Sequence, residues 1–298
     1  MKEAGNKPAE SLRVLLRDLI DYAGLFPPAG LDMKMAVANY ARYLNGEYAW
    51  MLGRFVLPAS RLGEFEDAMP HGELSPWPLS VLVGPKLDQD IAALEAFAPR
   101  CGKFAFIDSV ETKVASPADI EKARHLIGPA TITYYETPLT PELPSLLDAI
   151  KAVNGRAKIR TGGVTSDAFP SSSQIATFIV ECAKRDLPFK ATAGLHHPLR
   201  CVKPLTYEPN APTGTMHGFL NVFLAAELAR SGGAVEQLTE MLNDNDPSRV
   251  RFNDEAAHWH DHRFPTSDIE STRRNFAISF GSCSFEEPIA DLKALNLL

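Results

Sequence analysis

Short β-prone segments alternate with amphipathic helical segments along most of the 298-residue chain. This alternation is typical of a parallel sheet whose strands are joined by helical crossovers. An eighth strand within residues 19–25 would complete the set, although helical and strand patterns conflict there. The other seven predicted strands begin at Trp50, Pro78, Lys103, Thr131, Ala157, Phe189 and Phe276.

Helical patterns fill the intervals between these strands. Two stretches carry neither pattern: residues 201–215 are rich in proline, and residues 244–265 are polar and irregular. The first helical pattern begins at Ser11 and covers the first part of residues 11–25. The other predicted helices cover residues 33–44, 61–69, 88–98, 117–127, 141–153, 169–185, 216–230, 235–243 and 288–298.

Seven or eight strand–helix units in a chain of this length favour an α/β fold of the (β/α)8 TIM-barrel type. No Gly-x-Gly-x-x-Gly sequence follows a predicted strand, which argues against a dinucleotide-binding sheet. No change of composition marks a domain boundary. We therefore expect residues 11–298 to form a single barrel domain after a flexible tail of residues 1–10.

Composition limits the binding partners and the cellular location that we expect for the protein. A net charge of −7 gives no electrostatic support for binding nucleic acid. No apolar run is long enough to span a membrane, and residues 1–10 lack the apolar centre of a signal peptide. Four widely spaced cysteines indicate neither a disulfide framework nor a zinc knuckle, so a cytoplasmic location is expected. Assembly into a homo-oligomer stays open.

Two sequence blocks carry a lysine close to the predicted carboxyl end of a strand. They are Ala157-Lys158-Ile159-Arg160-Thr161-Gly162-Gly163 and Pro188-Phe189-Lys190-Ala191-Thr192-Ala193-Gly194-Leu195-His196-His197-Pro198. The helical segment between them makes one βαβ unit with parallel strands. In a parallel α/β protein, the carboxyl ends of the strands are where chemistry takes place.

Strand parity predicts which of these side chains face the barrel interior. Lys158 and Arg160 share a face opposite Ile159, and Lys190 shares one with Thr192. The apolar residues suit the helix layer, so the charged residues should point inward. By the same parity Glu136 follows Tyr134 inward, and Asp108 follows Phe104 and Phe106. The residues expected to line one mouth are Asp108, Glu136, Lys158, Arg160 and Lys190.

Two lysines and an arginine on adjacent strands repel one another. Such repulsion lowers the pKa of a lysine and favours its nucleophilic free amine. A neighbouring carboxylate, Asp108 or Glu136, could then transfer protons. The same groups would also suit a site that only binds an anion, or a structural network of ion pairs.

The segment Lys158-Ile159-Arg160-Thr161-Gly162 resembles the Lys-x-x-Thr-Gly strand of class I aldolases of the deoxyribose-phosphate aldolase type. The resemblance implies that Lys158 forms a Schiff base, that Lys190 tunes its pKa, and that Asp108 assists proton transfer. It covers two short blocks and one acid. The chain departs from that pattern at Arg160, in the glycine spacing after Lys190, and in the additional loop of residues 201–215, which leaves the substrate open.

Several residues near the strand ends could hold an anionic substrate. Gly162 and Gly163 could instead form a simple turn between strand and helix. His196 and His197 could be a hydrogen-bonded pair in a loop. The candidate substrate-binding residues are Arg160, Thr161, Gly162, Gly163, Thr192, His196 and His197.

Metal and thiol chemistry are the remaining alternatives. Asp108, Glu111 and Glu136 could hold Mg²⁺ and stabilise an enolate, although neighbouring lysines would already neutralise these acids. The alternating histidines of residues 258–262 are expected in an exposed loop rather than at a metal. Cys283 follows the last strand, but the sequence places no base beside it.

The sequence thus predicts a barrel enzyme that acts on a small anionic carbonyl compound, phosphorylated or carboxylated. The expected chemistry is lyase or aldolase chemistry through a Schiff-base lysine, with no metal or cofactor. One alternative is metal- or acid/base-assisted enolisation in the same mouth, in which Mg²⁺ would act. The other is a barrel that binds a small anion without catalysis.

Overall fold

Eight parallel strands close into a barrel in the computed structural model, which describes residues 7–70 and 75–298. Around the barrel the strands follow the order β1-β13-β7-β6-β5-β4-β3-β2. The predicted TIM-type fold is confirmed, including an eighth strand within residues 19–25. The barrel strands are β1 (Ile20–Tyr22), β2 (Leu52–Pro58), β3 (Trp77–Leu82), β4 (Ala105–Lys113), β5 (Ile132–Glu136), β6 (Arg156–Arg160), β7 (Phe189–Thr192) and β13 (Ala277–Ser282).

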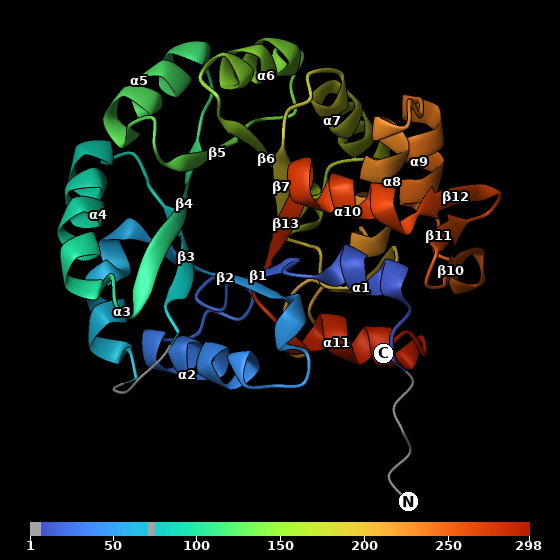
Figure 1. Cartoon of the computed structure of the whole chain (residues 1–298), viewed down its shortest axis with the longest axis horizontal. Coiled ribbons are helices and arrows are strands. Elements are labelled where there is room, and N and C mark those ends of the chain that lie inside the picture. Colours follow the sequence, from blue (N-terminus) through green and yellow to red (C-terminus); the bar gives the residue numbers. More distant parts are fainter. Residues whose placement is uncertain (1–6, 71–74) are drawn as a thin grey trace, which may run out of the picture.

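Helices surround the barrel and cover the outer face of its strands (Figure 1). Asp32 and Ser116 cap α2 and α5 by accepting hydrogen bonds from backbone N–H groups, which stabilises the first turns. The helices are α1 (Glu10–Leu16), α2 (Met33–Leu44), α3 (Leu62–Ala68), α4 (Leu87–Cys101), α5 (Pro117–Ile127), α6 (Leu143–Ala152), α7 (Ser172–Lys184), α8 (Phe219–Arg230), α9 (Val235–Asn243), α10 (Thr266–Asn275) and α11 (Glu286–Ala294).

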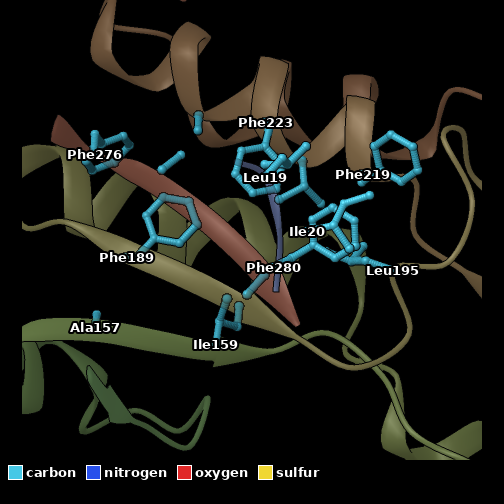
Figure 2. Packing of buried hydrophobic residues seen from close by; sticks show 14 of the residues in the cluster. Leu19, Ile20, Ala157, Ile159, Phe189, Leu195, Phe219, Phe223, Phe276 and Phe280 are labelled. Carbon is cyan, nitrogen blue, oxygen red and sulfur yellow. The ribbon is translucent and has the colours of Figure 1, made fainter. Parts of the chain in front are cut away.

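The main core lies between these helices and the strands. Figure 2 shows Phe219 and Phe223 of α8 above Phe280 of β13, with Ile159 of β6 lower in the view. The Phe219 and Phe280 rings stack with centroids 5.4 Å apart. Ile159 is fully buried in this layer, as its predicted position opposite Lys158 requires. Burial of this apolar layer fixes which face of β6 and β13 points into the barrel.

The segment between β7 and β13 departs from the predictions. Part of the proline-rich stretch forms a hairpin of β8 (Cys201–Pro204) and β9 (Thr213–Met216). The prediction that residues 244–265 are irregular is wrong. Half of them form an antiparallel sheet of β10 (Val250–Phe252), β11 (Ala256–Trp259) and β12 (His262–Pro265), and α10 follows directly. Apolar residues such as Ala257, Trp259 and Phe264 are buried there, so polar composition hid a small core.

The structure describes the amino-terminal region from residue 7 onward. Most of the predicted tail, residues 1–6, lies outside the described residues. The first helix begins one residue earlier than expected, at Glu10, whose backbone N–H donates a hydrogen bond to Asp254. None of the helices in residues 7–70 and 75–298 has the length and apolar character needed to cross a membrane.

Candidate active site

A cavity of about 1010 Å³ opens where the carboxyl ends of the barrel strands meet the following loops. Residues from the β8–β9 hairpin, including Leu205 and Tyr207, line one side of it. The loop of Phe26, Pro27 and Pro28 lines another part of the wall. The cavity is therefore partly covered by chain segments outside the barrel itself.

The two lysines lie side by side at the base of this cavity. Lys158 of β6 is the register partner of Lys190 of β7 on one side and of Glu136 of β5 on the other. Both lysine side chains are at most 3% exposed, and both line the cavity. The parity prediction that turned Lys158, Lys190 and Glu136 inward is confirmed.

Carboxylates alternate with the lysines. Lys158 Nζ lies 2.7 Å from Glu111 Oε2 and 2.7 Å from Glu136 Oε2. Lys190 Nζ lies 2.6 Å from Glu111 Oε1 and 2.5 Å from Asp21 Oδ2. Glu111 therefore bridges the two ammonium groups, and each lysine contacts two carboxylates. We call these five residues, Asp21, Glu111, Glu136, Lys158 and Lys190, the lysine–carboxylate cluster.

Hydroxyl, guanidinium and aromatic groups surround the cluster. Ser80 donates to Glu111 at 2.5 Å and Ser279 to Asp21 at 2.7 Å. The backbone N–H of Arg54 donates to Asp21, and its guanidinium lies 3.5 Å from the same carboxylate. The ring of Tyr134 lies under Lys190 Nζ, 5.3 Å from the ring centroid. These contacts hold the carboxylates in fixed positions.

The protonation states follow from this geometry. Burial alone would raise the pKa of each cluster carboxyl, but the neighbouring cations outweigh it. Lys190 and Arg54 hold the pKa of Asp21 below its usual range, and Lys158 does so for Glu111 and Glu136. Burial would lower the pKa of Lys190, but Asp21 and Glu111 raise it above its usual range. Lys190 is therefore a stable cation, and the predicted lowering of a lysine pKa by repulsion is wrong for this residue.

Asp108 does not take the place predicted for it. Leu79 pairs with Ile107, but the next residue, Ser80, pairs with Ser109, so Asp108 is the extra residue of a β-bulge in β4. Asp108 instead pairs with Arg54 at 2.5 Å, and it is not among the described residues that line the cavity. The bulge shifts the alternation by one residue and turns Glu111, rather than the predicted acid, toward the lysines.

The predicted anion-binding residues divide into two groups. Arg160, Gly163 and Thr192 line the cavity, and Arg160 Nε lies 3.2 Å from Glu136 Oε1. Thr161 and Gly162 do not belong to the described lining. The Thr161 hydroxyl donates to the carbonyl of Ala193 at 2.6 Å, which ties the ends of β6 and β7 together.

The glycine after Thr161 has a packing role. A Cβ on Gly162 would lie 2.8 Å from the Cα of Gly194, so the two backbones require glycine where they meet. Neither Thr161 nor Gly162 is among the described residues that line the cavity, and their predicted contact with a substrate stays a prediction. Both residues set the spacing of the strand ends.

Both predicted histidines line the cavity, and both pair with acids of α11. His196 Nδ1 lies 2.9 Å from Glu287 Oε2, and His197 Nδ1 lies 2.6 Å from Asp291 Oδ2. Both earlier interpretations thus apply: the rings reach the cavity and are also held by hydrogen bonds.

The acids proposed for Mg²⁺ do not converge. Asp108 pairs with Arg54, whereas Glu111 and Glu136 are engaged by lysines. Within residues 7–70 and 75–298, no group of three histidine, cysteine or acidic side chains is arranged to hold a metal ion. The alternating histidines of residues 258–262 belong to the β11–β12 hairpin.

Sequence reasoning missed Asp21 as a member of the cluster and considered Glu111 only as a metal ligand. Asp21 lies in a strand of three residues whose pattern also fits a helix. Its position directly after the apolar run Leu19-Ile20 was the available signal.

Fold and site together define a (β/α)8 barrel with a buried lysine–carboxylate cluster at the carboxyl ends of its strands. No protein-family model matches the chain, and a search of curated proteins finds no significant match.

Proposed function

We propose that the protein is a lyase of the aldolase type that binds a small anionic carbonyl compound as a Schiff base on Lys158. One observation carries the proposal: Lys158 Nζ faces the cavity while held 2.7 Å from two carboxylates. The resemblance of Lys158-Ile159-Arg160-Thr161-Gly162 to the aldolase strand supports the same residue. The neighbouring cation Lys190 matches the second lysine of that pattern.

The cluster suits the charge changes of imine formation. The ammonium group of Lys158 first gives up a proton, which Glu136 can accept, and the free amine adds to the substrate carbonyl. Loss of water from the carbinolamine then gives a protonated imine. This iminium ion has the same charge as the original ammonium group, so Glu111 and Glu136 remain compensated throughout.

The number of N–H donors changes along this path. The ammonium group of Lys158 has three, but a protonated imine has only one. One of the two carboxylates therefore loses its hydrogen bond when the imine forms. Glu111 keeps Lys190 as a partner, so we assign the freed carboxylate to Glu136. Glu136 can then take the proton that is released when the carbon–carbon bond next to the imine breaks or forms.

The rim of the cavity can hold the anionic end of the substrate. The Arg160 side chain is 45% exposed and lines the cavity above Glu136. Lys113, 73% exposed, adds a second cation to the lining. Both are free to reorient toward a carboxylate or phosphate, unlike the fully engaged lysines beneath them.

Borohydride trapping tests this proposal. The protein is incubated with a panel of small aldehydes and keto acids, reduced, and analysed by intact mass and peptide mapping. A reduced adduct is expected on Lys158 and should be absent from Lys158→Arg, which keeps the positive charge but cannot form the imine. Lys113→Arg makes the same substitution at the solvent-exposed rim. This variant is the matched control and should retain the adduct.

Absence of any adduct across the panel, or labelling scattered over surface lysines, would overturn the Schiff-base mechanism for these compounds. Retained binding of the same anions by calorimetry would then favour an anion-binding barrel.

A further inference from the structure

A second cluster of reactive side chains lines the same cavity, on the side of β13 and the β8–β9 hairpin. It consists of Cys283, His196, Glu287 and Tyr207, which we call the thiol cluster. The chemistry assigned to Lys158 uses none of these four residues. The sequence offered no base for Cys283, because its partner lies 87 positions away.

The two ring nitrogens of His196 face different groups. Nε2 lies 3.9 Å from Cys283 Sγ, and Nδ1 lies 2.9 Å from Glu287 Oε2. A nucleophile on one nitrogen and an orienting carboxylate on the other is the arrangement by which a histidine activates a thiol. The Tyr207 hydroxyl donates to the same carboxylate at 2.9 Å and lies 3.9 Å from Sγ. Tyr207 therefore holds Glu287 in place from the hairpin.

The charges around His196 favour its cationic form. Burial would lower its pKa, but Cys283 and Glu287 raise it to about 9. His197 has its ring centroid 6.3 Å from that of His196 and is itself paired with Asp291. Tyr207 reaches Cys283 and Glu287 from the hairpin. An imidazolium next to a thiol stabilises the thiolate, which is the nucleophilic form.

The thiol cluster also lies at a useful distance from the lysines. Ala191, the residue after Lys190, pairs with Phe280 of β13, and Cys283 follows Phe280 by three residues. At roughly 3.3 Å per residue, the backbone of Cys283 stands about 10 Å beyond the level of Ala191, toward the opening of the barrel. The two clusters can therefore act on separate parts of one cavity.

We propose that Cys283, His196 and Glu287 form a nucleophilic triad that accepts an acyl group from an ester or thioester. Sγ attacks the acyl carbon, the new carbon–sulfur bond forms, and the bond to the alcohol or thiol leaving group breaks with its electron pair. The proton held by His196 passes to that leaving group. Water, deprotonated by His196, then releases the carboxylic acid and restores the thiol. This proposal does not depend on a Schiff base at Lys158.

Alkylation with iodoacetamide tests the nucleophile. In the full-length protein, peptide mapping should show Cys283 alkylated faster than Cys201, which lies on the hairpin and is partly buried. His196→Asn should slow alkylation of Cys283 at neutral pH by about 10-fold or more, because the thiol loses the imidazolium beside it. His197→Asn is the matched control and should leave the rate unchanged. Equal rates at both cysteines, or no effect of His196→Asn, would overturn the triad.

Acylation with p-nitrophenyl acetate tests the class of substrate. We expect a burst of p-nitrophenolate and a single acetyl group on Cys283 that hydroxylamine removes, as for a thioester. Cys283→Ala should lose both signals. Lys158→Arg should keep both, which separates this result from the Schiff-base proposal. Acetyl groups found only on lysines, or a burst unchanged in Cys283→Ala, would overturn the assignment of an acyl-accepting site.

Discussion

Lys158 and Lys190 are register partners on neighbouring strands, yet their ammonium groups are not left to repel each other. The carboxylate of Glu111 reaches from β4 and contacts both, at 2.7 and 2.6 Å. Two like charges in a buried site require such a bridge, because removing them from water without counter-charges costs several kcal/mol each. Glu111 is thus the residue on which the arrangement of both lysines depends.

Removal of the central carboxylate should affect stability and chemistry together. Glu111→Gln leaves two buried ammonium groups with one carboxylate partner each, and should lower the free energy of unfolding by about 3–5 kcal/mol. Urea denaturation at neutral pH measures this change. Ser80→Ala removes only a hydroxyl that donates to Glu111 and should cost about 1 kcal/mol. Comparable losses in the two variants would contradict the bridging role of Glu111.

The β-bulge separates the roles of the two acids predicted for proton transfer, Asp108 and Glu136. Asp108→Asn should leave formation of the Lys158 adduct essentially intact, since Asp108 contacts Arg54 rather than the lysines. Glu136→Gln should reduce the rate of adduct formation by about 10²-fold, as expected for loss of a general acid/base. Time-resolved borohydride trapping gives both rates. A larger loss in Asp108→Asn than in Glu136→Gln would restore the acid predicted from the sequence.

The shifted pKa values set the pH range over which the fold is stable. Asp21, Glu111 and Glu136 have lowered pKa values in the folded state. Between their unfolded and folded pKa values the unfolded chain binds more protons, so stability falls as pH decreases below about 5. Lys190 has a raised pKa, so its contribution is complete below an unfolded pKa of about 10.4 and is lost as pH rises beyond it.

Urea titrations across pH should therefore show a broad plateau through neutral pH, with an acid decline that is shallower in Glu111→Gln. A maximum confined to alkaline pH would be inconsistent with these carboxylates being ionised in the native protein.

The loops after β6 and β7 meet so closely that one added methyl group at Gly194 should lower the stability of the fold. Gly194 has φ of +74°, and a Cβ there would lie 2.8 Å from the Cα of Gly162. Gly194→Ala should therefore destabilise the protein by about 1–3 kcal/mol. Gly63→Ala in α3, where a Cβ meets nothing within 4 Å, should instead stabilise it by about 0.5–1 kcal/mol. Thermal unfolding of the two variants provides the comparison.

The sequence was sufficient to predict the barrel fold and the inward-facing side chains of two strands, β6 and β7. On β6 and β7 alternation runs without interruption, so apolar residues such as Ile159 and Phe189 correctly identified the opposite, charged face. On β4 the same reasoning failed, because a bulge is a property of the pairing between strands and not of the strand's own pattern. Contacts such as His196 with Cys283 join distant segments, and no local pattern encodes them.

The bulge in β4 also bears on how a barrel of this kind can change over generations. A single residue gained or lost at the bulge is absorbed there, because the pairing on both sides of it is unchanged. Deletion of Asp108 alone would leave Ile107 opposite Leu79 and Ser109 opposite Ser80, so Glu111 would still face the lysines. One residue lost between Ser109 and Glu111 would instead exchange the inward and outward rows. The bulge is therefore a place where the length of β4 can vary by one residue while the acid between the two lysines is retained.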